Sequence, residues 1–342
     1  MGKTLRTMLC GCGGMSNAWL RIASEIPEVE IVGLMDIDVE NAQARAEQHE
    51  LTDVKIGTDL TGMLDELQPD VVFDCSVPEA HVTITLEALQ RGCHVMGEKP
   101  LADSMENARK MVAAAQAADR IYAVIQNRRY QPQIRRLRAF LDSGVLGPLT
   151  TLNSDFYIGA HFGGFRDRME HVLLLDMAIH SFDQARLISG ADPVKVYCRE
   201  WNPKGSWYDH DASAIAIFEM TDGIVYTYRG SWCAEGLNTT WECDWRAIGP
   251  EGSVTWDGAD ALKTQVVAER GEFFSKHKEV DVPEAPADAR LGGHRGVIGE
   301  FVECVLNGGT PETACTDNIK SLAMVFGAIQ SAQEGREIEI DV

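Results

Sequence analysis

The 342-residue sequence has no apolar run that approaches the roughly 18 residues of a membrane-spanning helix. Its first residues lead directly into a strand-like segment and lack the pattern of a secretion signal. We therefore expect a globular protein that stays in the cytoplasm and binds no membrane. At this length two domains are the default expectation, each long enough to bury its own core.

Basic residues are scarce, because 31 lysines and arginines stand against 52 aspartates and glutamates. The formal net charge of -21 repels a phosphate backbone at long range, so we expect no nucleic-acid partner. The nine cysteines are scattered and odd in number, without the spacing of a disulfide framework or a zinc site. Reduced thiols fit this pattern best. The sequence also lacks internal repeats and low-complexity linkers.

A glycine-rich turn follows the first expected strand, residues 6–10, and precedes a helix expected over residues 17–25. Its letters, Gly11-Cys12-Gly13-Gly14-Met15-Ser16, nearly match the G-x-G-x-x-G/A pattern of dinucleotide-binding folds. Glycine at 11 permits the tight turn, and glycine at 13 lets backbone amides approach a pyrophosphate at the helix N-terminus. Serine at the third small position departs from the pattern, although it is nearly as small as alanine.

The second expected strand, residues 30–35, ends at Asp36. In a dinucleotide-binding fold an acidic residue at this place hydrogen-bonds the adenosine ribose and repels a 2′-phosphate. Asp36 therefore favours NAD over NADP. The alternative is that Asp36 and Asp38 only cap the helix expected over residues 39–49.

Strands and helices continue to alternate up to residue 125. Further strands are expected at 71–75, 94–97 and 121–125, and further helices at 59–68, 81–91 and 104–118. This alternation predicts an α/β Rossmann domain with a doubly wound parallel sheet. The turn Cys75–His81 leaves one carboxyl end of that sheet, where such folds bind ligands. His81 in this turn serves equally well as a helix-start residue.

A second turn at the same edge, Gly97-Glu98-Lys99-Pro100-Leu101, carries the first catalytic candidate. Pro100 favours an extended Lys99, so the lysine should lie just beyond the carboxyl end of its strand. The alternative is a surface turn with a solvated lysine.

From residue 149 the pattern changes to strand-like segments without long helices between them. Strands are expected at 149–157, 194–200, 212–219, 223–231, 241–249, 253–256 and 337–340, and helices at 132–143, 292–307 and 317–334. They predict a second, α+β domain with a large, mainly antiparallel open sheet. Arg135, Arg136 and Arg138 in the first of these helices could bind phosphate, but in an acidic protein we favour a salt-bridged surface.

An apolar helix expected over residues 172–183 carries Asp176 and His180 on one face, four residues apart. An acid and an imidazole in such a helix need partners, so one interpretation is a buried structural pair. A second is a metal site completed by His171, although the spacing matches no known metal motif. The third is acid-base chemistry on a substrate.

The chain resembles the glucose-fructose oxidoreductase/inositol dehydrogenase (Gfo/Idh/MocA) family over nearly its whole length. The stretches that carry the resemblance are Gly11–Met15, Ser76–His81, Glu98–Leu101 and Asp176–His180. The Glu-Lys-Pro turn followed by a distant Asp-x-x-x-His is the most specific of them. One departure is the lead-in to that helix and its interior, where the family often has Gly-Gly-Gly and a further glycine. This chain has Glu170-His171-Val172-Leu173-Leu174-Leu175 and Met177-Ala178 there.

The resemblance implies NAD as cofactor, a sugar or cyclic polyol as substrate, no metal, and a sheet whose open face pairs subunits into a homodimer or homotetramer. It implies that Lys99 and His180 are catalytic, that Asp176 binds substrate and orients the histidine, and that Lys99–Pro100 is a cis peptide bond. The residues expected at the cofactor are Gly11, Gly13, Gly14, Met15, Asp36, Ser76, Pro78, His81, Glu98, Lys99 and Asn127. Those expected at the substrate are Lys99, Arg128, His161, Phe165, Asp176 and His180.

We therefore expect residues 1–126 to bind the dinucleotide and residues 127–342 to bind substrate and form oligomers. In the expected reaction His180 takes the proton of a secondary alcohol, and Lys99 hydrogen-bonds the same oxygen while a hydride passes to nicotinamide. Two alternatives are a dehydrogenase of a non-sugar alcohol, such as a cyclic dihydrodiol, and a non-catalytic regulator that senses a dinucleotide or sugar. The presence of all three catalytic candidates argues against the regulator.

Overall fold

The computed structural model describes residues 3–287 and 290–342, which fold into two units. The first unit consists of residues 3–127 and 290–322, and the second of residues 128–287 and 323–342. The chain therefore returns to its first unit near its carboxyl end. Helix α9 (Cys315–Glu334) begins in the first unit and ends in the second.

The sequence-based division left residues 290–322 in the second domain, and the structure differs there. Helix α8 (His294–Asn307) packs against α1 (Ser16–Ala23) and β5 (His94–Gly97) of the first unit. Its Phe301 ring lies 6.5 Å from the ring of Phe73. Periodicity predicts that a segment is helical but not which sheet the helix covers. The sequence of residues 290–322 therefore does not show that they belong to the first unit.

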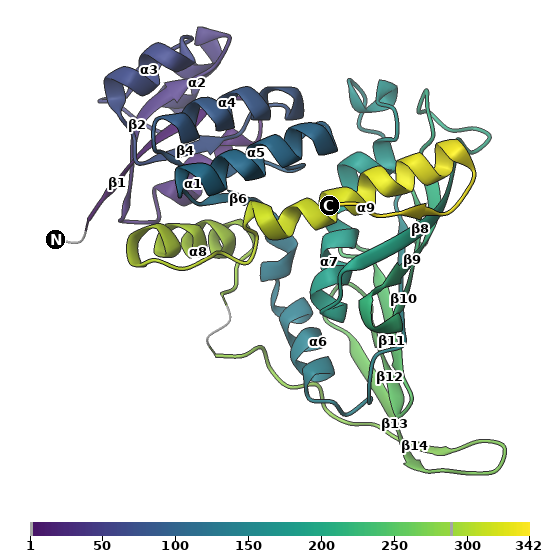
Figure 1. Cartoon of the computed structure of the whole chain (residues 1–342). Coiled ribbons are helices and arrows are strands. Elements are labelled where there is room, and N and C mark those ends of the chain that lie inside the picture. The colour runs from purple at the N-terminus through teal and green to yellow at the C-terminus, as the bar shows by residue number, and fades with distance from the viewer. Residues whose placement is uncertain (1–2, 288–289) are drawn as a thin grey trace. The chain divides into compact units, whose positions relative to one another are not determined.

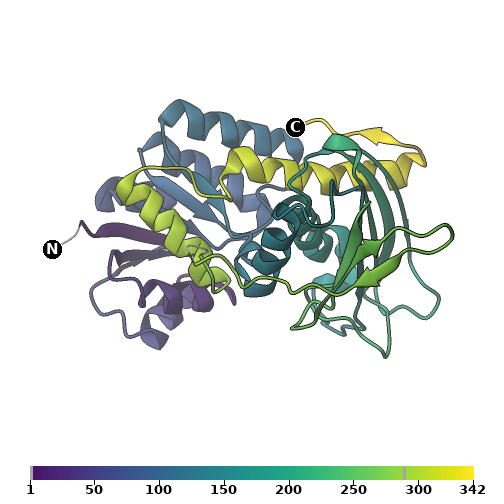
Figure 2. The ribbon, with the colours of Figure 1, turned by 90° about the horizontal axis from the view of Figure 1, so that it is seen from below.

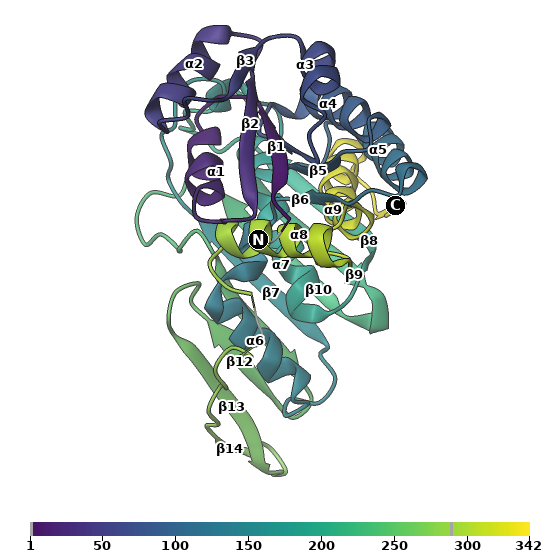
Figure 3. The same cartoon turned by 90° about the vertical axis from the view of Figure 1, so that its left-hand side faces the viewer.

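A six-stranded parallel sheet forms the core of the first unit, in the order β3-β2-β1-β4-β5-β6. Its other strands are β1 (Leu5–Cys10), β2 (Val29–Met35), β3 (Lys55–Gly57), β4 (Val71–Asp74) and β6 (Tyr122–Val124). Its other helices are α2 (Val39–Gln48), α3 (Leu60–Leu67), α4 (Pro78–Gln90) and α5 (Met105–Ala118). Helices α1 and α2 lie on one face and α4 and α5 on the other (Figure 3). The expected Rossmann fold is confirmed, and the strand order reverses between β1 and β4, where such folds bind ligands.

A nine-stranded sheet dominates the second unit, in the order β14-β13-β12-β11-β7-β10-β9-β8-β15. Its strands are β7 (Thr151–Tyr157), β8 (Pro193–Trp201), β9 (Ser213–Met220), β10 (Val225–Ser231), β11 (Asp244–Gly249), β12 (Gly252–Trp256), β13 (Leu262–Glu269), β14 (Lys276–Lys278) and β15 (Ile338–Glu339). Strands β7 and β10 are parallel and the other pairs are antiparallel. The expected open, mainly antiparallel sheet is confirmed.

One face of this sheet is covered by α6 (Pro132–Asp142), α7 (Ile179–Ser189) and the later part of α9 (Figures 1 and 2). The buried Phe182 of α7 packs against the rings of Phe218, Tyr226 and Tyr228. Side chains of β8 and β9 alternate between buried and exposed, as expected of a sheet with one open face. Among the described residues of this unit, no helix covers the other face.

Two differences from the expected elements matter. Strands β3, β13 and β14 were not expected. β3 and β14 have three residues each and lie at sheet edges, so they leave little pattern in the sequence, whereas the eight-residue β13 was simply missed. The helix expected over 172–183 begins instead as a π-helix, Leu173–Ala178, which α7 then continues. Within residues 3–287 and 290–342, none of the helices combines the length and hydropathy that crossing a membrane requires.

Candidate active site

The glycine turn after β1 touches the turn after β4. Gly11 has a φ of +86°, and a Cβ placed on it would lie 2.6 Å from Ser76 N. Only glycine fits there, because any side chain would strain the backbone and collide with the neighbouring turn. Gly13 and Gly14 are exposed and have open space around them, and Met15 is the N-cap residue of α1. The backbone amides at this helix start can therefore receive the pyrophosphate of a dinucleotide.

Asp36 ties the end of β2 to this turn. Its Oδ2 accepts a hydrogen bond from Cys12 N at 2.6 Å, and its Oδ1 accepts from Asp38 N at 2.9 Å. The cap of α2 is Asp38, whose side chain accepts from Glu40 N. The capping alternative thus applies to Asp38, and Asp36 lies at the turn where a ribose-binding carboxylate is expected.

Arg45 is a residue at this turn that the sequence analysis missed. It extends from α2, and its guanidinium donates to Gly13 O at 3.0 Å and to Ser16 Oγ at 3.0 Å. The charge therefore lies beside the exposed glycines, where it favours a bound phosphate. Its partners are a carbonyl and a hydroxyl that only the fold brings close. The role of Arg45 therefore cannot be predicted from spacing in the sequence.

His81 lies behind the turn after β4 rather than at its surface. Its Nδ1 lies 2.8 Å from Asp74 Oδ2, and Ser76 Oγ donates to Asp74 Oδ1 at 2.5 Å. Burial opposes the charged imidazole, but the charge and hydrogen bond of Asp74, helped by Glu98, outweigh it and raise the pKa of His81. Because the ring is 1% exposed, it has no surface to offer a cofactor. The structure therefore favours His81 as a support of the turn instead of a direct cofactor contact.

Lys99 lies two residues past the end of β5, as expected from Pro100, and the Lys99–Pro100 peptide bond is cis. The preceding Glu98 is buried and fixed, since its carboxylate accepts from Trp19 Nε1 at 2.7 Å and from Lys99 N at 3.2 Å. Pro100 and Leu101 are buried while Lys99 is half-buried. The structure thus places the lysine at the carboxyl edge of the parallel sheet, and the solvated surface turn is not supported.

Other candidates of the first unit lie at the same edge. Pro78 is the first residue of α4, directly after the β4 turn. Asn127 follows β6, and its side-chain amide lies 3.2 Å from His294 Nδ1. The expected cofactor residues therefore follow the carboxyl ends of five different strands of one sheet, and His81 is buried behind them.

In the second unit, Asp176 lies inside the π-helix and His180 in the first turn of α7. Asp176 Oδ2 accepts from Arg166 Nε at 2.7 Å, and Oδ1 lies 3.4 Å from Arg166 Nη2. The side chain of Asp176 is 14% exposed and His180 is 8% exposed. Both groups are largely shielded yet keep some access to the surface, as reacting groups require.

Arg166 is the second functional residue that the sequence analysis missed. Its guanidinium carbon lies 4.9 Å and 4.8 Å from the ring centroids of Phe162 and Phe165, two favourable cation-π contacts. The Phe162 ring in turn packs edge-on against Trp232 at 5.1 Å. A short aromatic-arginine cluster on the loop before the π-helix therefore lies beside Asp176.

The remaining substrate candidates divide between two places. Arg128 contacts the residue that follows Asp176, because its guanidinium lies 3.3 Å from Met177 Sδ. His161 turns away from it: the ring stacks on Trp207 at 3.7 Å, and Nε2 lies 2.8 Å from Glu235. The structure thus joins Phe165 and Asp176 through Arg166, and it leaves Arg128 and His161 in separate contacts.

The metal alternative finds no support in the structure. His171 bonds to Glu200 instead of joining Asp176 and His180. In the part of the chain that the structure describes, no group of three or more histidines, cysteines, aspartates or glutamates is arranged to hold a metal ion.

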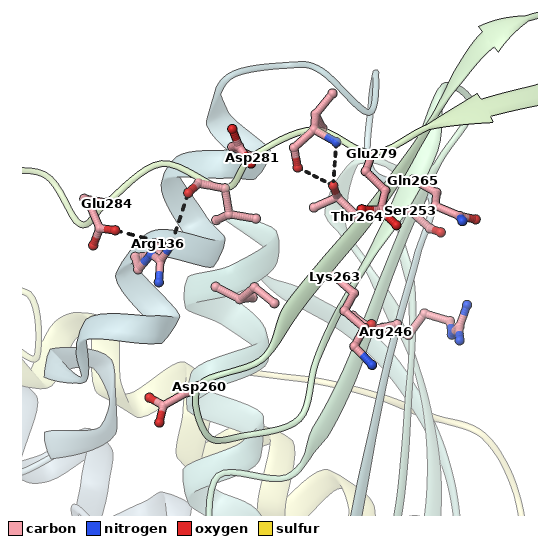
Figure 4. Close-up of a pocket in the computed structure, with 14 residues that line it drawn as sticks. Arg136, Arg246, Ser253, Asp260, Lys263, Thr264, Gln265, Glu279, Asp281 and Glu284 are labelled. Atoms are coloured by element: carbon pink, nitrogen blue, oxygen red, sulfur yellow. Dashed lines mark hydrogen bonds and ion pairs between the residues drawn. The ribbon is translucent and has the colours of Figure 1, made fainter.

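A groove of about 810 Å³ lies elsewhere in the second unit, near α6 and strands β11 to β13 (Figure 4). Arg136 of α6 donates to Pro283 O at 2.9 Å and to Val282 O at 3.1 Å, and so fastens a passing segment to the helix. Arg138 pairs with Asp142 at 2.6 Å. The salt bridge of Arg138 is of the kind favoured from the sequence, whereas Arg136 mainly binds backbone carbonyls. None of the residues expected at cofactor or substrate lines the groove.

Comparisons with known proteins agree with this geometry. Residues 5–126 match a family model described as "Oxidoreductase family, NAD-binding Rossmann fold", and residues 134–255 match the "GFO/IDH/MocA C-terminal domain". D-apiose dehydrogenase of Paraburkholderia graminis is 26% identical over 99% of this chain and 90% of its own length. D-glucoside 3-dehydrogenase of Escherichia coli is 34% identical over 49% of each chain.

The fold also matches solved structures. An oxidoreductase from Agrobacterium radiobacter, in complex with NAD+, L-tartaric acid and magnesium, superimposes with a TM-score of 0.84 at 21% identity over 99% of both chains. At this identity the match shows a shared fold.

Proposed function

The chain belongs to the Gfo/Idh/MocA family of oxidoreductases, and from this we propose that it oxidises a secondary alcohol of a sugar, glycoside or cyclic polyol with NAD as the acceptor. The observation that carries the proposal is Lys99, half-buried at the carboxyl edge of the NAD-binding sheet and preceded by a fixed Glu98. Relatives named as dehydrogenases of apiose and of glucosides support the substrate class.

The residues fit a bound dinucleotide. Gly13 and Gly14 leave the start of α1 open for the pyrophosphate, and Asp36 and Arg45 flank that turn. Bound NAD would supply the hydride acceptor. Asp36 favours the unphosphorylated ribose, so we propose NAD rather than NADP.

The chain's own residues have distinct roles in this proposal. His180 accepts the hydroxyl proton, because a shielded imidazole is a suitable general base near neutral pH. Lys99 donates a hydrogen bond to the reacting oxygen and stabilises its developing negative charge. Asp176, held by Arg166, binds a neighbouring hydroxyl of the substrate and limits the orientations that the sugar can take.

The aromatic-arginine cluster supports a ring-shaped substrate. The Phe165 ring is 64% exposed beside Arg166, and exposed aromatic faces commonly stack on sugar rings. We propose that Phe165 and Arg128 line the substrate side of the site. His161, stacked on Trp207, would reach substrate only by leaving that contact.

The test is a panel of sugars, inositols, glycosides and cyclic dihydrodiols, assayed for reduction of NAD. Turnover of a sugar or polyol is the expected result. Turnover of the dihydrodiols alone would favour the non-sugar alternative. Tight NAD binding with no turnover of any alcohol would favour a regulator and overturn the proposed reaction.

We also propose that a second copy of the chain covers the open face of the nine-stranded sheet. Apolar side chains there are exposed by roughly two fifths each, a pattern that marks interaction surfaces. They are Val194, Tyr197, Ile215, Ile217 and Val225. Sedimentation of the wild type should show a dimer or tetramer, and Ile217→Lys should dissociate it; a monomeric wild type would refute this assembly.

A further inference from the structure

Residue 171 has an unusual backbone conformation at the start of the helix that carries Asp176 and His180. The φ of His171 is +52°, a left-handed value that glycine adopts freely and that a residue with a Cβ adopts at a cost. Its carbonyl accepts a hydrogen bond from Leu175 N at 3.0 Å. The residue that opens this helix is therefore strained, and contacts of its side chain must hold it in place.

The imidazole of His171 is held from two sides. Its Nδ1 lies 2.6 Å from Glu200 Oε2 on β8, and its Nε2 lies 3.2 Å from the side-chain amide of Gln333 on α9. The Glu200 side chain is 2% exposed, and its Oε1 is buried with no partner among the described residues. A buried carboxylate without a hydrogen-bond partner is costly in free energy. The contact between Glu200 and the imidazole is therefore strongly favoured.

The proton of the imidazole is on the Glu200 side. Because an amide nitrogen only donates, Nε2 accepts from Gln333, and Nδ1 carries the proton and donates it to Glu200. The hydrogen bond to Glu200 also raises the pKa of His171 against the effect of burial, and the nearby charges of Glu170 and Asp211 add to it.

The start of the helix matters because the first turn is a π-helix. A π turn accommodates one more residue than an α turn, and Asp176 lies inside it whereas His180 lies after it. Successive residues of an α-helix point about 100° apart. Loss of the π turn would therefore rotate Asp176 relative to His180.

We propose that His171 is a positioning residue that, clamped between Glu200 and Gln333, fixes the start of the π-helix and so the relative orientation of Asp176 and His180. This rests on the proposed function of those two residues.

The variant His171→Gly tests the clamp, because glycine accepts the left-handed backbone and removes only the imidazole. We expect it to fold, to bind NAD within a few-fold of wild type, and to lose about 10- to 100-fold in kcat, the loss typical of misplaced reacting groups. Glu200→Gln keeps a hydrogen-bond acceptor, so its kcat should fall less than that of Glu200→Leu. His210→Gly, at an exposed histidine of the same unit, is the matched control and should retain full turnover.

A second measurement does not depend on turnover. The ring-proton resonance of His180, assigned through its loss in His180→Ala, should titrate with a shifted midpoint in His171→Gly and with the wild-type midpoint in His210→Gly. If His171→Gly lowers the melting temperature but leaves kcat and this midpoint unchanged, His171 is merely structural and the proposal is overturned. If wild type oxidises no alcohol, the proposed function fails, and the midpoint alone decides the role of His171.

Discussion

The carboxylate of Asp176 is paired with the guanidinium of Arg166, with Oδ2 and Nε 2.7 Å apart, so the acid that we propose binds substrate is tied to the loop that precedes it. We expect Arg166→Gln to lower kcat/KM for the alcohol by about 10- to 150-fold, since removal of a charge-assisted hydrogen bond of this kind costs roughly 1.5 to 3 kcal/mol. The exposed Arg168 of the same short helix supplies the control, Arg168→Gln. Equal kinetics in the two variants would show that the pair does not act on substrate.

Lys99→Met should lower turnover by about 10²- to 10⁴-fold, the usual range for a positioned acid-base group, while NAD affinity changes by only a few-fold. Methionine keeps the length of the side chain and removes its charge and donors. Lys110→Met is the matched control, since Lys110 is exposed on α5 and pairs only with Glu106 among its described contacts. Turnover close to wild type in Lys99→Met would remove this lysine from the mechanism.

Asp36→Ala combined with Ile37→Arg should raise the preference for NADP over NAD by about 10-fold or more, because a repelling carboxylate is replaced and a phosphate partner is added. Ile37 is 95% exposed, so Ile37→Arg alone controls for the added charge and should still prefer NAD. The melting temperature of the double variant should also be lower, because Cys12 N loses its hydrogen-bond acceptor. Use of both cofactors by the wild type would contradict the assignment to NAD.

His180→Ala and Asp176→Asn separate a catalytic pair from a structural one. If the pair were only structural, each variant should lose the roughly 1 to 3 kcal/mol of an unsatisfied buried polar group and keep normal chemistry in its folded fraction. We expect the opposite: melting close to wild type with most of the turnover lost. Melting curves and single-turnover rates on the same preparations distinguish the two.

Stability should fall in mild acid through His94. Burial, helped by Arg120, lowers the pKa of His94 to about 4, and its Nδ1 accepts a hydrogen bond from Ile121 N at 3.0 Å. The pKa in the folded protein is below the ordinary histidine value of 6.5. The stability that neutral His94 contributes is therefore fully present above about pH 6.5 and is lost as the pH falls towards 4.

The measurement is the melting temperature as a function of pH in His94→Asn, whose Oδ1 can accept the same hydrogen bond without titrating. Its loss of stability between pH 6.5 and 4 should be smaller than that of the wild type. His277→Asn, at an exposed histidine of β14, should follow the wild type. Parallel curves for all three proteins would show that His94 does not titrate in this way.

Sequence reasoning predicted those parts of the fold and site that depend on local pattern. The glycine turn, the strand ending at Asp36 and the Lys99-Pro100 turn all follow from residue types that permit few conformations, and all lie where they were expected. The contacts of Arg45 and Arg166 were not predicted, since their partners come from elsewhere in the fold. The π-helix was not predicted either, because a six-residue, mostly apolar segment is too short for its periodicity to separate a π turn from an α turn.

Helix α9 has a consequence for dissecting the protein. Its first residues belong to the unit of the parallel sheet and its last residues to the unit of the nine-stranded sheet, while α8 precedes it in the first unit. A fragment cut after residue 127 would therefore lack a buried helix against Phe73, and the complementary fragment would carry that helix with nothing to cover it. A fragment that contains the whole first unit would need residues 3–127 and 290–322 joined by an engineered linker.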